Sequence, residues 1–292
     1  MMALSPATAE RAATVAEQAA DQAGVEIRVV DDLRGLSDVC ALLDSIWHPE
    51  PTNPLLTTEF ARALSHAGNY VAGAFDGDEL VGACVGFLAA PPGEVMHSHV
   101  AGVTETALGR HIGWAMKLHQ RAWALHHGLR EITWTFDPLV RRNAYFNLVK
   151  LAARPREYLV DFYGDIPDAV NAGQGSDRLL LAWDLAAPQV VAACDGRPVE
   201  ALDDESLARL VQVISVSDAA RPVVAAGGEW RSSGLVAIQL PADISALRLD
   251  DPSAAREWRE AVRMVLGGLM DDGWRVTGFS RSEGYVVERT AE

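Results

Sequence analysis

The sequence has few cysteines, no long apolar run and no run of basic residues. Cys40, Cys84 and Cys194 lie far apart without metal-site spacing, so we interpret them as reduced core residues of a cytoplasmic protein. No segment approaches the roughly eighteen consecutive apolar residues that a membrane span needs. Residues 1–24 lack the basic start and apolar stretch of a signal peptide, and predict a helix or a tail. We expect no membrane association.

Basic charge is also scarce. The chain has 25 Lys and Arg against 40 Asp and Glu, a formal net charge of −15. Nothing would balance the repulsion from a phosphate backbone, so the sequence argues against nucleic-acid binding. With 292 residues, 49% of them hydrophobic, the chain can bury one large core or two modest ones.

Periodicity and turn signals predict an α/β layout with an antiparallel first half and helices on both faces. Thr57 or Thr58 can cap the third element, and Asp76-Gly77-Asp78 forms a hairpin turn. The predicted order is strand 25–30, helix 33–47, a helix ending near 68, strands 69–75, 79–90 and 94–103, helix 109–127, strand 130–136, helix 140–152 and strand 157–163.

A Gly/Asn/Pro-rich connector at 165–177 separates this part from a tail with a different pattern. The tail predicts strands 178–185 and 188–196, a helix over 203–214, a strand over 234–244, a long helix capped by Asp251 or Ser253, and a terminal hairpin. We therefore expect an N-terminal helix or tail at 1–24, a main domain at 25–178, and a C-terminal α/β extension or subdomain at 179–292.

The start of helix 109–127 is the most informative segment. Gly109 and Gly113 leave its first turn sterically open, and the first N–H groups of a helix have no intrahelical acceptor. Such an N-terminus suits a phosphate or pyrophosphate.

The element order from about residue 25 to 165 resembles the GCN5-related N-acyltransferase (GNAT) superfamily element for element. A local resemblance points to a branch of predicted GNAT acetyltransferases in which a WTFDPL strand end precedes an RNA-x-FN helix start. Here Trp134 to Leu139 match the first part, and Arg142, Asn143, Ala144, Phe146 and Asn147 match the second. Trp258, Arg259 and Arg263 of the tail also fit. The resemblance implies a mixed central sheet flanked by helices, acetyl-CoA or another acyl-CoA as co-substrate, and no metal.

The family holds the acyl-CoA pyrophosphate on a turn with the pattern Arg/Gln-x-x-Gly-x-Gly/Ala. Aligning Gly113 with the last position places His111 at the first glycine and Leu108 at the Arg/Gln. His111 then either reduces CoA affinity or contacts a phosphate alongside Arg110. The resemblance implies cofactor contacts from Val103, Gly109, Arg110, His111, Ile112, Gly113, Trp114 and Asn143.

Acyl transfer to an amine needs a base and an acid. His97 and His99 alternate on one predicted strand and so share one face; either could be the base, or both could be structural histidines. Glu105 is a second base candidate. Because Leu148 stands where many family members have the acidic tyrosine, Tyr145, one helical turn away, is the candidate acid, although it could also lie in the core.

Asp137, Arg142 and Asn147 form the expected substrate-binding cluster with Asn143. Asp137-Pro138 could instead cap the following helix. Asn143 and Asn147 are four residues apart and are expected to share a helix face.

The function that these patterns favour is acyl-CoA-dependent N-acyl transfer, with an acetyl or succinyl donor, to a small amine or amino acid. One alternative is a catalytically inactive GNAT-like binding or regulatory protein with a degenerate pyrophosphate loop. Another is a transferase that uses a different activated donor, such as an aminoacyl ester. A homodimer is possible.

Overall fold

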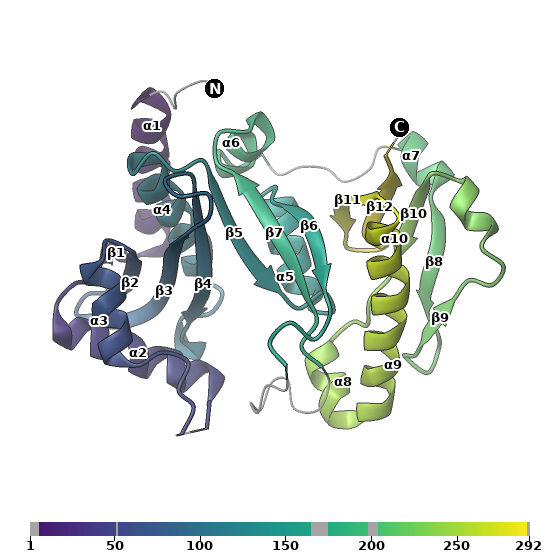
Figure 1. The fold of residues 1–292 in the computed structure, drawn as a ribbon, viewed down its shortest axis with the longest axis horizontal. Helices are drawn as coiled ribbons and strands as arrows, with labels where there is room; N and C mark the ends of the chain where they lie inside the picture. Colours follow the sequence, from purple (N-terminus) through teal and green to yellow (C-terminus); the bar gives the residue numbers. More distant parts are fainter. Residues whose placement is uncertain (1–5, 51, 165–174, 198–203, 291–292) are drawn as a thin grey trace. The chain divides into compact units, whose positions relative to one another are not determined.

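A computed structural model describes residues 6–50, 52–164, 175–197 and 204–290. It has a mixed α/β fold, as expected, and divides into two compact units (Figure 1). The first unit runs to Trp134 and includes Asp184–Ala187, and the second begins at Thr135.

Among the described residues, the first unit contains four helices, one 3-10 turn and five strands, and the last two residues of β5 fall in the second unit. They are α1 (Pro6–Ala23), β1 (Glu26–Val29), α2 (Leu33–Trp47), α3 (Thr58–His66), β2 (Tyr70–Asp76), β3 (Glu79–Ala89), β4 (Val95–Val103), η1 (Glu105–Ala107), α4 (Ile112–His126) and β5 (Glu131–Phe136). The strand order is β1-β2-β3-β4-β5. Neighbours from β1 to β4 are antiparallel, and β5 is parallel to β4.

Helices cover both faces of this sheet. Helices α2 and α3 pack on one face, where Leu36, Val39 and Leu43 of α2 meet Val71 and Val85 in a continuous apolar core. Burying each such side chain stabilises the fold by about 1.5–3 kcal/mol. Helix α4 packs on the other face, and α1 lies beside α4 (Figure 1).

Helix α4 is buried on most sides because the sheet and α1 both cover it. Its C-terminus is fixed by Gly128, which has a φ of 76°. The N–H of Gly128 donates to Leu125 O and the N–H of Leu129 donates to Ala124 O, at 3.1 and 2.9 Å. This pair of bonds is the Schellman motif, in which glycine tolerates the left-handed position.

The second unit contains a strand pair and a separate five-stranded sheet. Its elements are α5 (Arg141–Tyr145), η2 (Phe146–Lys150), β6 (Arg154–Leu159), β7 (Arg178–Asp184), α6 (Pro188–Cys194), α7 (Asp204–Arg209), β8 (Val211–Val216), β9 (Pro222–Val224), η3 (Glu229–Ser232), β10 (Leu235–Ile238), α8 (Ile244–Asp250), α9 (Pro252–Val262), η4 (Arg263–Gly267), α10 (Gly268–Asp271), β11 (Trp274–Ser280) and β12 (Gly284–Arg289). Strands β6 and β7 are antiparallel. The five-stranded sheet has the order β11-β12-β10-β8-β9 and is mixed, because β8 runs parallel to β10.

Several predicted elements of the second unit were wrong. Residues 188–194 form helix α6 rather than a strand, because Pro188 suits a first helical turn and alanines follow the two valines. The helix predicted over 203–214 ends at Arg209, and the β-branched run from Val211 pairs as β8. The segment predicted as a helix over 140–152 is helical from Arg141 to Lys150, but only its first five residues are α-helical and the rest form a π-helix. The strand predicted over 157–163 instead begins at Arg154 and ends at Leu159.

Residues 165–174 of the predicted connector lie outside the described residues. Within the described part of the chain, no helix is long and apolar enough to cross a membrane.

Candidate functional site

The pairing between β4 and β5 ends after three residues. Val95, Met96 and His97 pair with Glu131, Ile132 and Thr133, and the pairing stops there. β4 continues to Val103 while remaining paired to β3 on its other side. The edge of β4 from Ser98 to Val103 therefore has no β5 partner among the described residues, which leaves backbone donors and acceptors available there.

A β-bulge lies where the two strands separate. Gly86 of β3 pairs with Ser98 and the neighbouring Val85 pairs with Val100, so His99 has no partner on β3. Bulges bend a strand and redirect a side chain, and they are frequent beside active sites.

The two histidines of β4 share a face, as the alternation predicted. Their ring centroids are 6.4 Å apart, and both rings contact Phe87 at 5.2 and 5.9 Å. His97 is half-buried with Nδ1 3.0 Å from Thr133 Oγ1, whereas His99 is exposed. Burial, helped by neighbouring His99, lowers the pKa of His97 to about 4. Desolvation also lowers the pKa of His99, so burial favours the neutral form of both imidazoles.

The turn from β4 into α4 leaves its helix N-terminus open. His111 is the N-cap residue with a φ of 63°, and the N–H groups of Trp114 and Ala115 donate to its carbonyl at 3.0 and 3.1 Å. The described residues contain no acceptor for the N–H groups of Ile112 and Gly113. A Cβ added at Gly109 or Gly113 would meet no described heavy atom within 4 Å. The side chain of His111 is exposed and does not fill the space at these glycines.

The other side chains of the turn differ in the contacts that they make. Arg110 forms an ion pair with Asp76 at 2.7 Å and donates to the carbonyls of Ala23 and Gly24, so its guanidinium ties the turn to neighbouring segments. Glu105 is exposed in η1. Val103, the last residue of β4, pairs with Gly82.

A buried polar cluster that sequence reasoning missed lies beneath β4. The ammonium of Lys117 donates to Ser98 Oγ and Gln120 Oε1, both at 3.0 Å, and lies 4.0 Å from the centroid of the Trp134 ring. Gln120 Nε2 donates to Cys84 Sγ at 3.2 Å. Burial lowers the pKa of Lys117 to about 8. The sequence signal that could have revealed this cluster is the spacing of Lys117, Gln120 and Arg121 within a helix otherwise rich in apolar residues.

In the second unit, Asp137 lies in a buried ion-pair cluster. Its carboxylate accepts two bonds from Arg259 at 2.8 Å and one from Arg248 at 2.5 Å, and Asp137 Oδ1 also accepts from the N–H of Leu139. Burial alone would raise the pKa of Asp137, but the two guanidinium groups and these bonds hold it well below its usual range. Asp137 does not cap α5, whose N-cap residue is Val140.

The remaining candidates of the second unit do not form one surface. Asn143 and Arg142 are exposed, while Asn147 is buried. Of the two amides predicted to share a helix face, only that of Asn143 is exposed, so the pair does not form one accessible surface. The Tyr145 ring contacts the Arg281 guanidinium at 4.3 Å.

The described residues contain no group of three or more His, Cys, Asp or Glu side chains arranged to hold a metal ion.

The sequence matches no protein-family model and no curated protein. Among solved structures, it is similar to an acetyltransferase of the GNAT family from Streptococcus pneumoniae (12% identity, TM-score 0.43, covering 54% of this chain and 97% of that one). It is also similar to an N-acetyltransferase from Staphylococcus aureus Mu50 (15%, 0.46, 55% and 98%) and to an aminoglycoside 6'-N-acetyltransferase complexed with coenzyme A (15%, 0.43, 56% and 98%). These similarities concern the fold of roughly half the chain and carry no information on its activity.

Proposed function

We propose that the first unit binds an acyl-CoA and transfers its acyl group to a small amine or amino acid. The observation that carries this proposal is the early end of the β4–β5 pairing, with a bulge at His99 and an open helix N-terminus shortly after β4. An extended ligand that carries amide groups can pair with an unpartnered strand edge as an additional strand does. The pantetheine arm of CoA has this chemistry.

The residues of the turn fit the diphosphate of such a ligand. The N–H groups of Ile112 and Gly113 have no acceptor among the described residues, and the partial positive charge of the helix end favours an anion. Gly109 and Gly113 allow close approach of phosphate oxygens. Val103, His111 and Trp114 flank this position, and Arg110 supports the turn through Asp76.

His99 is the proposed general base because it is exposed at the bulge beside the unpaired edge. Its neutral imidazole would accept the proton that the attacking amine must lose. The new amide bond forms as the thioester C–S bond breaks, and the departing sulfur takes up one proton. His97, bonded to Thr133, would orient this face. Glu105 is a second candidate base. Tyr145, Asn143, Asp137, Arg142 and Asn147 belong to the second unit and take no part in this proposed step.

The proposal is tested by isothermal titration with acetyl-CoA and succinyl-CoA on the wild-type protein and on Gly113→Glu. A carboxylate at Gly113 should favour the helix end but repel the diphosphate, so we expect CoA-ester affinity to fall by tenfold or more without loss of thermal stability. Gln18→Glu adds the same charge at an exposed position of α1 and should bind like the wild type. Absence of binding to the wild-type protein at millimolar ester would refute the proposal.

A second candidate function is a binding or regulatory protein without turnover. Two observations favour it: His111 stands where the family pattern has a glycine, and the Arg110 guanidinium already pairs with Asp76. In that case a CoA ester, if bound at all, would form no acylated product with any amine. Mass spectrometry of reactions with a broad panel of amines distinguishes the two, since one acylated product that disappears in His99→Asn supports the transferase.

A further inference from the structure

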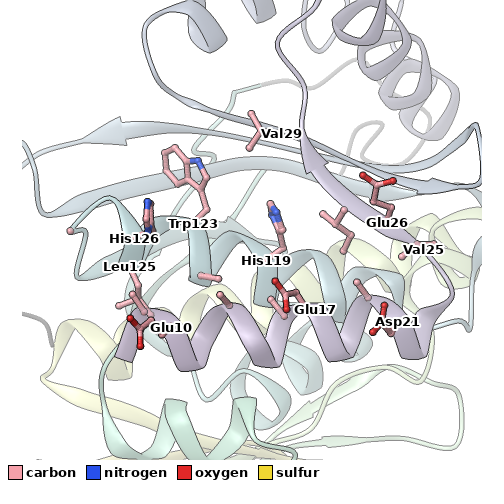
Figure 2. Close-up of a pocket in the computed structure, with 17 residues that line it drawn as sticks. Glu10, Glu17, Asp21, Val25, Glu26, Val29, His119, Trp123, Leu125 and His126 are labelled. Atoms are coloured by element: carbon pink, nitrogen blue, oxygen red, sulfur yellow. The ribbon is translucent and has the colours of Figure 1, made fainter. Parts of the chain in front are cut away.

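The first unit contains a groove of about 940 Å³ formed by α1, α4 and β1 (Figure 2). No residue of β4, or of the turn that leads from β4 into α4, lines this groove. Its volume lies in the range of small-molecule sites, roughly 300–1,000 Å³.

The walls of the groove are largely apolar. Helix α4 contributes Trp123 and Leu125, helix α1 contributes several alanines, and Val25, Ile27 and Val29 come from β1 and the residue before it. Where α1 presents Ala9, Ala13, Ala16 and Ala20, the side chains are too small to occupy the space. These walls would therefore remove the apolar part of a ligand from water.

The carboxylate side chains at the groove have no lysine or arginine among them. Glu10, Glu17 and Asp21 lie along one side of α1, and Glu26 comes from β1 (Figure 2). No Lys or Arg lines the groove, and Glu10, Glu17 and Asp21 have no ion-pair partner among the described residues. Glu26 Oε1 is 3.8 Å from Arg28 Nε, and both side chains are more than half exposed. The interaction is therefore weak, and Arg28 offsets little of the negative charge at the groove.

His119 does not balance this charge. His119 Nδ1 is 2.8 Å from the hydroxyl of Tyr70, and burial lowers the pKa of His119. His126 lies at the exposed end of α4. At neutral pH the groove thus combines apolar walls with an acidic rim.

We infer that this groove binds a small organic cation with an apolar body, such as an arylalkyl amine. The apolar part contacts the alanine, valine and tryptophan walls, and the ammonium lies among Glu17, Asp21 and Glu26. The groove shares no lining residue with the β4 edge or the turn, so this inference does not rest on the proposed acyl transfer.

The test compares phenylbutylamine, phenylbutanol and phenylbutyrate, which share one apolar body and differ in charge. Binding is followed by titration calorimetry and by tryptophan fluorescence, since Trp123 lines the groove. We expect the amine to bind at least tenfold more tightly than the alcohol and the carboxylate to bind most weakly. Added salt should weaken amine binding and leave alcohol binding unchanged.

Two variants locate the site. Glu17→Gln combined with Asp21→Asn should weaken amine binding about tenfold while changing alcohol binding less than twofold. Ala13→Phe, at an exposed position of α1, should fill the groove and abolish binding of both. Asp38→Asn, exposed on α2, is the control and should bind like the wild type.

Three results would overturn the inference: equal affinity for amine and alcohol, tighter binding of the carboxylate, or no binding of any probe at millimolar concentration. Unchanged amine affinity in the double variant, with an unchanged melting temperature, would also overturn it.

Discussion

At the scale of single residues, the most informative position is Lys117. The chain has one other lysine, Lys150, which is exposed. Lys117 is only 8% exposed and pairs with hydroxyl, amide and aromatic groups, with no carboxylate partner among the described residues. A buried cation without a counter-ion is costly, so this side chain has a measurable electrostatic signature.

Lys117→Met should change how stability depends on pH. The pKa of Lys117 is about 8 in the folded protein, whereas its ordinary value, which applies to the unfolded chain, is 10.5. Between these two pH values the unfolded chain binds more protons than the folded protein, so the free energy of unfolding rises with pH. Relative to Lys117→Met, the wild-type free energy of unfolding should therefore increase from pH 8 to 10.5, by on the order of 1–3 kcal/mol. Urea unfolding at several pH values measures this. Lys150→Met is the control and should show no such difference; a flat wild-type-minus-Met profile would contradict the prediction.

At the scale of elements, α4 carries much of the architecture of the first unit. It begins at the proposed diphosphate position, contributes Lys117 and Gln120 to the buried cluster, and forms one wall of the groove. The geometry of its two ends therefore affects several features at once.

Gly128→Ala should destabilise the protein by about 1–2 kcal/mol, because a φ of 76° forces a Cβ into the left-handed region. Gly128→Asn should cost less, since asparagine tolerates this conformation better. Chemical denaturation of both variants tests the order. Equal stability of the alanine and asparagine variants would show that the Schellman geometry does not control this helix end.

Local signals predicted the elements of the first unit well. Thr57 accepts the N–H of Phe60 as an N-cap, and β2 and β3 form the hairpin that the turn at Gly77 indicated. Residue patterns could not predict the π-helix at 146–150 or distinguish α6 from a strand, because tertiary packing decides such short apolar segments. They also missed Lys117, since periodicity cannot identify a polar side chain that is satisfied inside the core.

At the scale of the whole molecule, Asp137 links distant parts of the sequence within the second unit. Its partners Arg248 and Arg259 are 111 and 122 residues away. The interval 25–178, predicted as one domain, thus relies on residues beyond 178 for charge balance at Asp137. A C-terminal truncation would leave a buried carboxylate unpaired.

Asp137→Asn should destabilise the protein by about 3–5 kcal/mol, because two buried guanidinium groups lose their counter-ion. Because the folded pKa of Asp137 is lowered, this contribution is complete above the ordinary value of 3.8 and is lost as pH falls below it. The wild type should accordingly lose its advantage over the variant at acidic pH. Urea unfolding measures both effects.

Asp272→Asn serves as the comparison, because Asp272 pairs with Arg231 at a position where both side chains are about half exposed. Its cost should stay below about 1 kcal/mol. If both substitutions cost the same, burial does not set the strength of the Asp137 cluster.

The alanine contact between α1 and α4 restricts which sequences this fold can accept. Ala12, Ala16 and Ala20 are all nearly inaccessible to solvent, and small contact residues place two helix axes near the short end of the usual range of about 8–10 Å. A bulkier side chain at any of them must push the axes apart and reshape the adjoining groove. Distant relatives that keep this helix pair should therefore show only glycine, alanine or serine at these three positions, whatever else has diverged.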